Sequence, residues 1–562
     1  MASWVRKHYI ETALFCIFST ILTAFVIWYL HAEKMFYYWD YLQYQEKLIQ
    51  ICSQHIAINK RFDSLLYSIQ HDSYTDLGVY PLLPFCSVFG ASRMPYILYI
   101  YFLYGLPTTI VLFLSARRYA RFLAPTTTLS SVIILLTAVL APQLWAPVLM
   151  GFIDISGLIC VGVVLLITFR KTTSKFNVYD IIGIVTSLII MILLRRWYAY
   201  WAVGYVGGLF IESLLFSVFQ KNKPLSQLIE EILIICIITI CIPLALFLIG
   251  GNGLIQRFMA DYASIYYPWK FESTVIAFIG EFTAKFGLLV SLIFIFGVIF
   301  QGVYNPLKSR ILFLISSFCV TYFLFHTVQS FGPQHLYLLL PTIIIIISTT
   351  ISLGITRLKG IRAILGIVIF IMVLSANFIW VFVPMGDVSL GLVSRLFSQY
   401  RHPPLARHDM GSIKKLLQKT QSLYIQRDGW VTLVASSEEL NASLLRNACE
   451  YFQFKQTFCN AIALFSGVDV DGFPDVLFNS TYLLVAEPTQ THLRASDQRA
   501  LGIFAEEIKK SDSLGQYFQK ITPGYTLDKG ITVYIYIQKQ TVPMERIKSL
   551  FGDLVNIKPP KF

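Results

Sequence analysis

Long apolar runs constrain this chain more than any other feature. Eleven stretches of about twenty mostly apolar residues follow one another along the sequence, and an α-helix needs a run of that length to cross the hydrocarbon core of a bilayer. They lie near residues 10–30, 94–115, 125–146, 151–169, 178–195, 198–219, 228–250, 275–300, 310–327, 334–355 and 363–383. The sequence therefore predicts an α-helical polytopic membrane protein with about eleven transmembrane helices.

The composition excludes a water-soluble globule. Of the 562 residues, 56% are hydrophobic and 14% are charged, and the mean hydropathy is +0.63. The net charge of +13 is spread over short clusters between the apolar runs, so it gives no sign of nucleic-acid binding. We expect a multi-pass protein of the cell membrane whose first apolar run is a retained span, because that run lacks a signal-peptide cleavage site.

Clusters of Lys and Arg predict which side of the membrane each loop occupies. They fall at every second boundary between apolar runs, and loops rich in these residues stay in the cytoplasm. The clusters are Arg6 and Lys7; Arg117, Arg118 and Arg121; Arg170, Lys171 and Lys175; Lys221 and Lys223; Lys308 and Arg310; and Arg357, Lys359 and Arg362. The N-terminus is then cytoplasmic, and an odd number of spans leaves residues 31–93, 251–274 and 384–562 on the external side.

Two domains follow from this topology. Residues 1–383 form the predicted transmembrane domain, with residues 31–93 as its first external loop. From about residue 400 onward, β-rich runs alternate with helical ones, which predicts that residues 384–562 form a small extracytoplasmic α/β domain. In VTLVASSEELNASLLRNACEYF, the pair Ser436 and Glu439 predicts a capping box that opens a helix. The domain lacks the glycine-rich turn that would cradle the phosphates of a nucleotide.

Four of the nine cysteines fall in predicted external segments, where disulfides can form. Cys52 and Cys86 lie in the first loop, and Cys449 and Cys459 lie in the C-terminal domain. The bonds Cys52–Cys86 and Cys449–Cys459 are therefore candidates, and the sequence leaves the pairing open.

The segment YYWDYLQYQ places Asp40 about ten residues after the first apolar run. A carboxylate among aromatic rings at a membrane surface is costly to desolvate, which makes Asp40 a candidate for function. The alternative is an interfacial aromatic belt that contains a solvated acid. Tyr38 and Trp39 beside it are candidate substrate-binding residues.

The segment RRWYAYW violates the charge rule, because it places Arg195 and Arg196 at an external helix end. An arginine pair can bind a phosphate in a bidentate manner, and Trp197 and Tyr198 can line a cavity for a sugar ring or an acceptor. Arginines that reach toward lipid headgroups explain the same pattern.

Lys285 is a second cation inside an apolar run, with Glu281 one turn before it on the same helix face. The two charges can neutralise each other. A buried cation in a bilayer also marks a ligand path, so Lys285 is a candidate phosphate-binding residue. Asp154 is a further buried acid near the external start of the fourth span, where capping of a helix explains it equally well.

The segment FHTVQSFGPQHLYLLLP brings His326, His335 and Tyr337 to an external edge. His335 and Tyr337 are candidate substrate-binding residues. Two histidines in one loop fix no ligand geometry, so a divalent metal is not indicated and we predict no cofactor.

Taken together, these features resemble the GT-C superfamily of polytopic glycosyltransferases. The resemblance is to the family 39 type, which includes protein O-mannosyltransferases and the aminoarabinose transferases of lipid A. It covers an acid in a long first external loop, about eleven spans and an external C-terminal domain. The WDY around Asp40 matches the position of the catalytic acid of the family, and HLYLLLP at 335–341 is similar to a pattern that opens a late span, with His335 in place of an arginine.

The resemblance implies a sugar donor carried on a polyprenyl phosphate in the lipid bilayer and an acceptor hydroxyl on a glycan, lipid or protein. Asp40 would act as general base in an inverting transfer, while Arg195, Arg196 and Lys285 would stabilise the phosphate that leaves. A secondary transporter, a lipid-linked glycan flippase or a ligase remains the alternative, since these proteins also place charges in the membrane.

Overall fold

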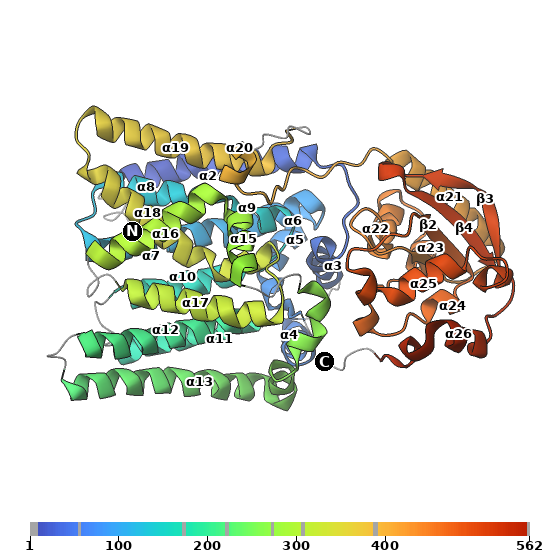
Figure 1. Ribbon diagram of the computed structural model, residues 1–562, viewed down its shortest axis with the longest axis horizontal. Coiled ribbons are helices and arrows are strands. Elements are labelled where there is room, and N and C mark those ends of the chain that lie inside the picture. The colour runs from blue at the N-terminus through green and yellow to red at the C-terminus, as the bar shows by residue number, and fades with distance from the viewer. Residues whose placement is uncertain are drawn as a thin grey trace. The chain divides into compact units, whose positions relative to one another are not determined.

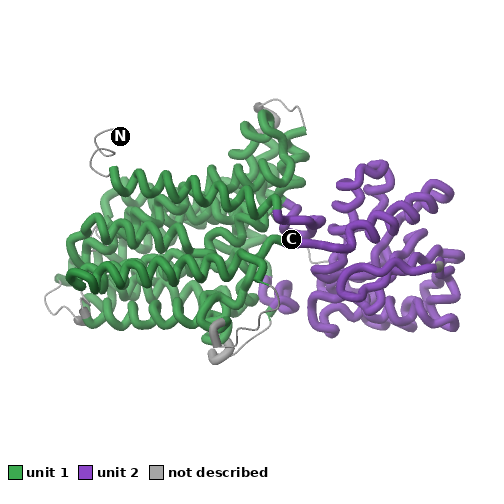
Figure 2. The backbone as a smooth tube through the Cα atoms, turned by 90° about the horizontal axis from the view of Figure 1, so that it is seen from above, with its two compact units in different colours: residues 1–31, 44–260, 270–404 green, residues 32–43, 261–269, 405–562 purple. Residues whose placement is uncertain are grey.

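The computed structural model describes residues 9–53, 58–72, 74–170, 176–219, 224–270, 275–304, 310–385 and 392–558. Several of the Lys and Arg positions used to predict topology lie outside these ranges, namely residues 6, 7, 171, 175, 221, 223 and 308. The chain forms two compact units (Figure 2). Unit 1 contains residues 1–31, 44–260 and 270–404, and unit 2 contains residues 32–43, 261–269 and 405–562. The contacts thus group the segment that carries Asp40 with the C-terminal part of the chain.

Unit 1 consists of helices that run side by side (Figure 1). In the described part of the chain, eight helical stretches are long and apolar enough to cross a membrane. They are Tyr9–Ala32 (α2), Arg93–Leu123 (α6, Arg93–Ile100, through α7, Leu106–Leu123), Thr128–Leu149 (α8, Thr128–Val139, and α9, Pro142–Leu149), Tyr198–Ser217 (in α12, Tyr198–Phe219), Leu225–Phe258 (α13), Ile311–Val328 (α17), Leu340–Arg357 (α18) and Ile361–Phe382 (α19). The predicted fold class, a polytopic helical membrane protein, is confirmed.

The count of eleven full spans needs correction. Helices α10 (Ile155–Thr168) and α11 (Val178–Leu194) match two predicted spans but have only 14 and 17 residues. At about 1.5 Å per residue, α10 is about 21 Å long, which is shorter than the hydrocarbon core of about 30 Å. The apolar run of α10 also includes the turn at 151–154, which hydropathy does not separate from helix.

The predicted span 275–300 is a broken helix. It consists of α15 (Val275–Phe286) and α16 (Leu288–Tyr304), and the stretches Ile279–Phe286 and Leu288–Val303 meet at an angle of 113°. Gly287 between them has φ +86°, and a Cβ there would lie 2.6 Å from the backbone carbon of Phe397. Glycine therefore permits both the turn and the close approach of the chain that follows the last span.

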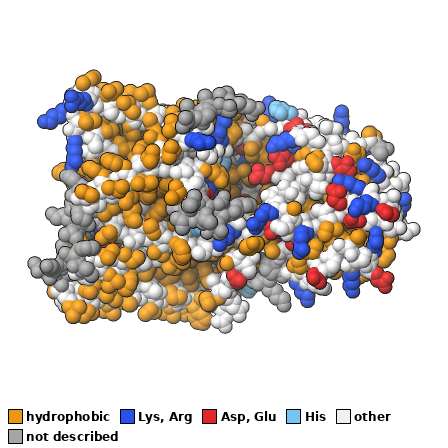
Figure 3. All heavy atoms as spheres, in the orientation of Figure 1, with side chains coloured by type: hydrophobic (Ala, Val, Ile, Leu, Met, Phe, Trp, Pro, Cys, Tyr) orange, Lys and Arg blue, Asp and Glu red, His pale blue; other side chains and the backbone are white. Residues whose placement is uncertain are grey.

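The segments between and after the spans contribute shorter helices. These are α3 (Asp40–Ser53), α4 (Ile58–His71), α5 (Leu83–Phe89), α14 (Tyr262–Ile265) and α20 (Leu392–Leu396). The disulfide Cys52–Cys86 joins the end of α3 to α5, so this candidate bond is confirmed. Hydrophobic side chains cover most of the visible face of unit 1 in Figure 3, as expected for a surface in contact with lipid.

Unit 2 is a three-layer α/β fold. Its mixed sheet has the order β1-β2-β4-β3, with β1 (Val431–Val434) parallel to β2 (Tyr482–Glu487), whereas β4 (Thr532–Gln538) is antiparallel to both β2 and β3 (Phe518–Thr526). One face packs against α21 (Met410–Gln426), α22 (Ala442–Tyr451) and α23 (Gln456–Ala461). The other packs against α24 (Val476–Asn479), α25 (Arg499–Glu507) and α26 (Met544–Phe551). Alternate strand residues enter the two cores, as the period of two requires.

Two details of unit 2 test the sequence predictions. The disulfide Cys449–Cys459 links α22 to α23 and is confirmed. The predicted capping box is wrong, because α22 starts at Ala442 and its N-cap is Asn441, whose side chain accepts from the Leu444 N–H. Asn is as good an N-cap as Ser, and Asn441 lies directly before the helix.

Candidate active site

Arg195 lies in a buried, fully enclosed position of unit 1. Helix α11 ends at Leu194, and Arg195 adopts an extended conformation that turns its side chain toward Asp154. Its Nε donates to the Asp154 carboxylate, and its guanidinium carbon lies 4.4 Å from the ring centre of Tyr74 and 5.3 Å from that of Tyr44. The cation is therefore held by an ion pair on its edge and by aromatic rings on its faces.

Asp154 does not cap a helix, although it precedes α10. Its side chain makes no capping bond and pairs with Arg195 instead, so the helix-capping alternative is wrong. The residue is completely buried, and its backbone carbonyl accepts from the Tyr198 hydroxyl at 2.9 Å. No described group donates to the buried Oδ2 of Asp154. An unpaired carboxylate oxygen is costly, which makes Oδ2 a place where a ligand or a water can donate.

His335 is an aromatic and polar neighbour of both candidate cations. It belongs to the 3₁₀ turn η5 (Gln334–Leu338), which precedes α18, and its ring contacts those of Trp197 and Phe325 at 5.5 and 4.8 Å. Burial, Arg195 and Lys285 together hold the pKa of His335 well below its usual value. The Gly332 N–H donates to Nδ1 at 3.0 Å, so the neutral ring carries its proton on Nε2. His335 is thus a neutral hydrogen-bond donor that feels the charges of both cations.

The other predicted residues near Arg195 are walls of this cluster. The Trp197 and Tyr198 rings stack at 4.1 Å, and no described acceptor reaches the buried Trp197 Nε1. Tyr337 is fully buried and donates to the Leu144 carbonyl at 2.9 Å. Arg196 lies half-buried in the turn between α11 and α12.

Lys285 sits at the end of α15, directly before the helix break. Its Nζ lies 3.1 Å from Glu281 and 4.7 Å from the ring centre of Tyr400, and the residue is 3% exposed. The predicted pairing with Glu281 is confirmed. The Lys285 carbonyl, which the break releases from the helix, accepts from Gln143 Nε2 at 2.9 Å and from Ser398 Oγ at 2.7 Å. Side chains therefore satisfy the broken helix, as buried backbone in a membrane requires.

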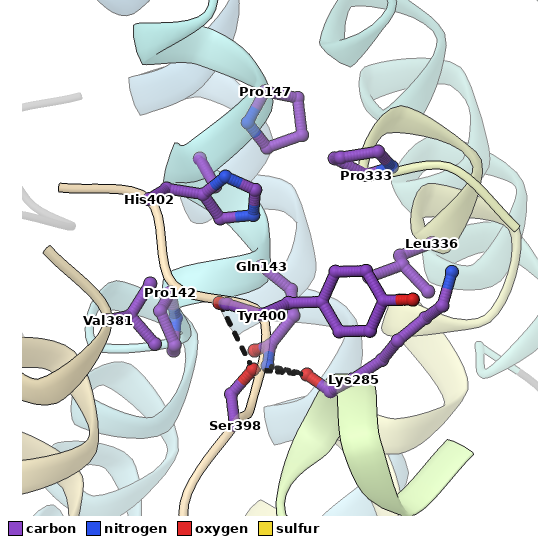
Figure 4. Close-up of a pocket in the computed structure, with 11 residues that line it drawn as sticks. Pro142, Gln143, Pro147, Lys285, Pro333, Leu336, Val381, Ser398, Tyr400 and His402 are labelled. Carbon is purple, nitrogen blue, oxygen red and sulfur yellow. Dashed lines mark hydrogen bonds between the residues drawn. The ribbon is translucent and has the colours of Figure 1, made fainter. Parts of the chain in front are cut away.

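Lys285 lines a small pocket that is partly open to solvent (Figure 4). The walls are mostly apolar, and they come from α9, from the turn before α18 and from the segment after α19. The lining residues are Pro142, Gln143, Ala146, Pro147, Lys285, Pro333, Leu336, Val381, Ser398, Tyr400 and His402. Burial and nearby Lys285 lower the pKa of His402 to about 4, so this ring is neutral at pH 7.

Asp40, Trp39 and Tyr38 lie in unit 2. Asp40 is the first residue of α3, a position where a carboxylate is favoured by the helix dipole. Trp39 before it has φ +45°, and its N–H donates to Ser443 Oγ at 3.2 Å. Tyr38 is buried in the core between the sheet and α22, and burial together with nearby carboxylates raises its pKa.

The structure therefore brings together, within unit 1, most of the predicted donor-binding residues. Arg195, Tyr198 and Tyr337 lie near Asp154. Trp197 contacts the rings of Tyr198 and His335, and Lys285 is close enough to influence the His335 ring. Two groups of neighbours were not predicted from the sequence. Tyr44 and Tyr74 lie against the faces of Arg195, and the segment 398–402 lies beside Lys285. The polar residues in FSQYRHPP, a short distance after the last apolar run, are a signal that could have indicated the second group.

The described residues contain no group of three or more His, Cys, Asp or Glu side chains that could hold a metal ion.

Several solved structures are similar to this chain, and three of them are described here. ArnT from Cupriavidus metallidurans bound to undecaprenyl phosphate is 11% identical with a TM-score of 0.45, over 82% of this chain and 76% of that chain. The apo state of ArnT is 10% identical with a TM-score of 0.37, over 80% and 76%. The oligosaccharyltransferase of Archaeoglobus fulgidus, in complex with zinc and sulfate, is 10% identical with a TM-score of 0.44, over 95% and 76%.

Scans of protein-family models and of curated protein sequences find no match. At these identities the structural matches transfer no residue role to this chain.

Proposed function

We propose that this protein is a membrane glycosyltransferase that moves a sugar from a polyprenyl-phosphate-linked donor to an acceptor hydroxyl on the external face. The observation that carries the proposal is the buried group formed by Arg195, His335 and Lys285, with Lys285 lining an apolar cavity. Hydrogen-bond donors of this kind suit a phosphate, and apolar walls suit the first units of a lipid chain.

The donor phosphate binds to Lys285 and to the Arg195–Arg196 region, with His335 donating through Nε2. Arg195 already pairs with Asp154, and Lys285 already pairs with Glu281. Before the donor binds, the net charge of these two pairs is therefore close to zero. A phosphate therefore enters by sharing the cations with these acids. Charge that develops on the leaving phosphate is then stabilised by donors that are already in place.

Asp40 serves as general base. Its carboxylate takes the proton of the acceptor hydroxyl while the hydroxyl oxygen forms a bond to the anomeric carbon of the sugar. The bond between that carbon and the phosphate oxygen breaks, and the electron pair leaves with the polyprenyl phosphate. Attack opposite the leaving group inverts the anomeric configuration. Trp39 and Tyr38 orient the segment that presents Asp40.

A transporter or flippase is the second candidate, and one observation favours it. The helix broken at Gly287 places Lys285 and a freed carbonyl beside a cavity, and transporters build substrate sites from broken helices. A glycosyltransferase can use the same break to hold a lipid phosphate.

The test uses the full chain in proteoliposomes with a radiolabelled polyprenyl-phosphate sugar. A transferase releases polyprenyl phosphate and labels an added acceptor, and Lys285→Met weakens donor use. Movement of the intact donor across the bilayer without release of polyprenyl phosphate would instead assign the protein to the flippase class.

A further inference from the structure

The carboxyl ends of β1 and β2 lie at one edge of the sheet of unit 2. These strands are parallel neighbours, and the helix after β1, α22, packs on one face of the sheet, whereas the helix after β2, α25, packs on the other. The loops that follow the two strands therefore meet at this edge.

The two loops at this edge are joined by hydrogen bonds. The Ser436 N–H donates to the Gln490 carbonyl at 2.9 Å, and Ser437 Oγ donates to the Gln490 side chain at 3.1 Å. Gln498 is 1% exposed, and its Oε1 accepts from the N–H groups of His492 and Leu493. The loop that carries His492 is therefore rigidly held at the sheet edge.

His492 presents one free nitrogen at this edge. Its Nδ1 lies 2.7 Å from the Ser436 carbonyl, which only accepts, so Nδ1 carries the proton and the neutral ring has its lone pair on Nε2. Burial lowers the pKa of His492, which keeps the ring neutral at pH 7. Within the ranges that the structure describes, no group donates to Nε2.

The aromatic segment before Asp40 lies against the same edge. The Trp39 ring is 4.7 Å from the His492 ring, and α22 holds the backbone beneath it: Asn447 accepts from the Tyr37 N–H at 2.9 Å, and Ser443 accepts from the Trp39 N–H. Trp39 is half-exposed. An aromatic face next to a hydrogen-bond acceptor fits a sugar, whose C–H face packs on the ring while a hydroxyl donates.

The geometry points to a binding site for a glycan acceptor at the carboxyl edge of β1 and β2, in which His492 Nε2 accepts from a sugar hydroxyl and Trp39 packs against the sugar ring. This inference rests on the proposed function and deepens it, since it identifies the acceptor as a carbohydrate bound one residue away from the proposed base. His492 here is a binding residue and takes no proton in the reaction.

Two substitutions separate binding from folding. His492→Asn keeps a donor at the position of Nδ1 and loses the acceptor at the position of Nε2, whereas His492→Gln restores a polar atom near that position. His408→Asn is the matched control, because His408 is an exposed histidine of the same unit. Initial rates in proteoliposomes are measured against a panel of mono- to trisaccharide glycosides and against a serine-containing peptide.

We expect His492→Asn to raise the KM for the glycoside about tenfold, the loss typical of one hydrogen bond, with the donor KM unchanged. Partial rescue by His492→Gln and wild-type kinetics in His408→Asn would support the site, whereas a wild-type glycoside KM in a folded His492→Asn would overturn it. Donor turnover that labels only the peptide, or no glycoside, would also overturn this inference while it supports the proposed function. Absence of any donor turnover would overturn the proposed function itself.

Discussion

Arg195 and Lys285 are both buried cations of unit 1, but their surroundings differ. Arg195 pairs with Asp154, which is 41 residues earlier in the chain, and aromatic rings cover its faces. Lys285 pairs with Glu281 on its own helical turn and lines a cavity. Both cations are nearly buried, but the Arg195 pair joins two segments of the chain and is covered by rings, so we expect it to stabilise the fold as well as to attract the donor phosphate. The Lys285 pair lies within one helical turn and borders a pocket, so we expect it to act mainly on donor binding.

Asp154→Asn tests whether the Asp154–Arg195 pair stabilises the fold, and it has the largest expected effect. The substitution leaves the Arg195 charge buried without a counter-charge, and removal of one partner from a buried pair costs about 3–5 kcal/mol. We expect a large fall in the unfolding temperature in detergent. The control is Glu506→Gln, because the surface pair with Lys509 is exposed and contributes about 0–1 kcal/mol. Equal effects of the two substitutions would show that the Asp154 pair is not structural.

Lys285→Met tests the other half of the comparison. It should raise the donor KM by about tenfold or more, since one charge-assisted bond to phosphate contributes about 1.5–3 kcal/mol. The double variant Glu281→Gln/Lys285→Met removes both charges of this pair. It should fold as well as the wild type and still use the donor poorly. Recovery of donor use in the double variant would mean that Lys285 only neutralises Glu281.

Gly287→Ala should perturb the Lys285 site through the backbone. The added Cβ meets backbone at 2.6 Å and the residue has φ +86°, so we expect a loss of about 1–3 kcal/mol in stability and weaker donor use. The matched control is Gly280→Ala, where a Cβ meets no described atom within 4 Å. The same Tm for both variants would show that the break tolerates a side chain.

The smallest expected effect is a pH dependence near the cavity. The pKa of His402 is about 4 in the folded protein and 6.5 in its ordinary state, because burial and Lys285 disfavour the charged ring. The unfolded chain therefore binds more protons between these values, and stability should fall as the pH drops from 6.5 to 4. Thermal unfolding of wild type and His402→Gln over this range measures the effect. An equally steep decline in His402→Gln would exclude His402 as the cause.

Local patterns in the sequence predicted much of the fold. Every predicted span coincides with helix, the strands at 431–434, 482–487 and 532–538 match β-rich runs, and the Glu281–Lys285 pair follows from helical spacing. Strand β3 was missed because Pro523 and Gly524 interrupt it, where the register with β4 shifts.

Contacts between distant segments were not predictable in this way. The position of Asp154 before a helix predicts a capping role, because acids are favoured at helix N-termini. Nothing in the neighbouring sequence indicates that its carboxylate pairs with Arg195 instead. Gly287 reads as one more small residue in an apolar run, so the break was missed. Asp40 and the Arg195 group were both identified from chemistry, but assignment of Asp40 to unit 2 requires the contacts of Tyr37 and Trp39 with α22.

The proposed function depends most on Asp40, the proposed base for sugar transfer. The most direct measurement is the rate of transfer from a radiolabelled polyprenyl-phosphate sugar in proteoliposomes, for wild type, Asp40→Asn and the control Asp63→Asn, an exposed acid of the same predicted loop. Loss of a general base predicts that Asp40→Asn is slower by about 10²–10⁴-fold, with donor binding retained and Asp63→Asn unaffected. A folded Asp40→Asn protein that transfers sugar at the wild-type rate would contradict the account.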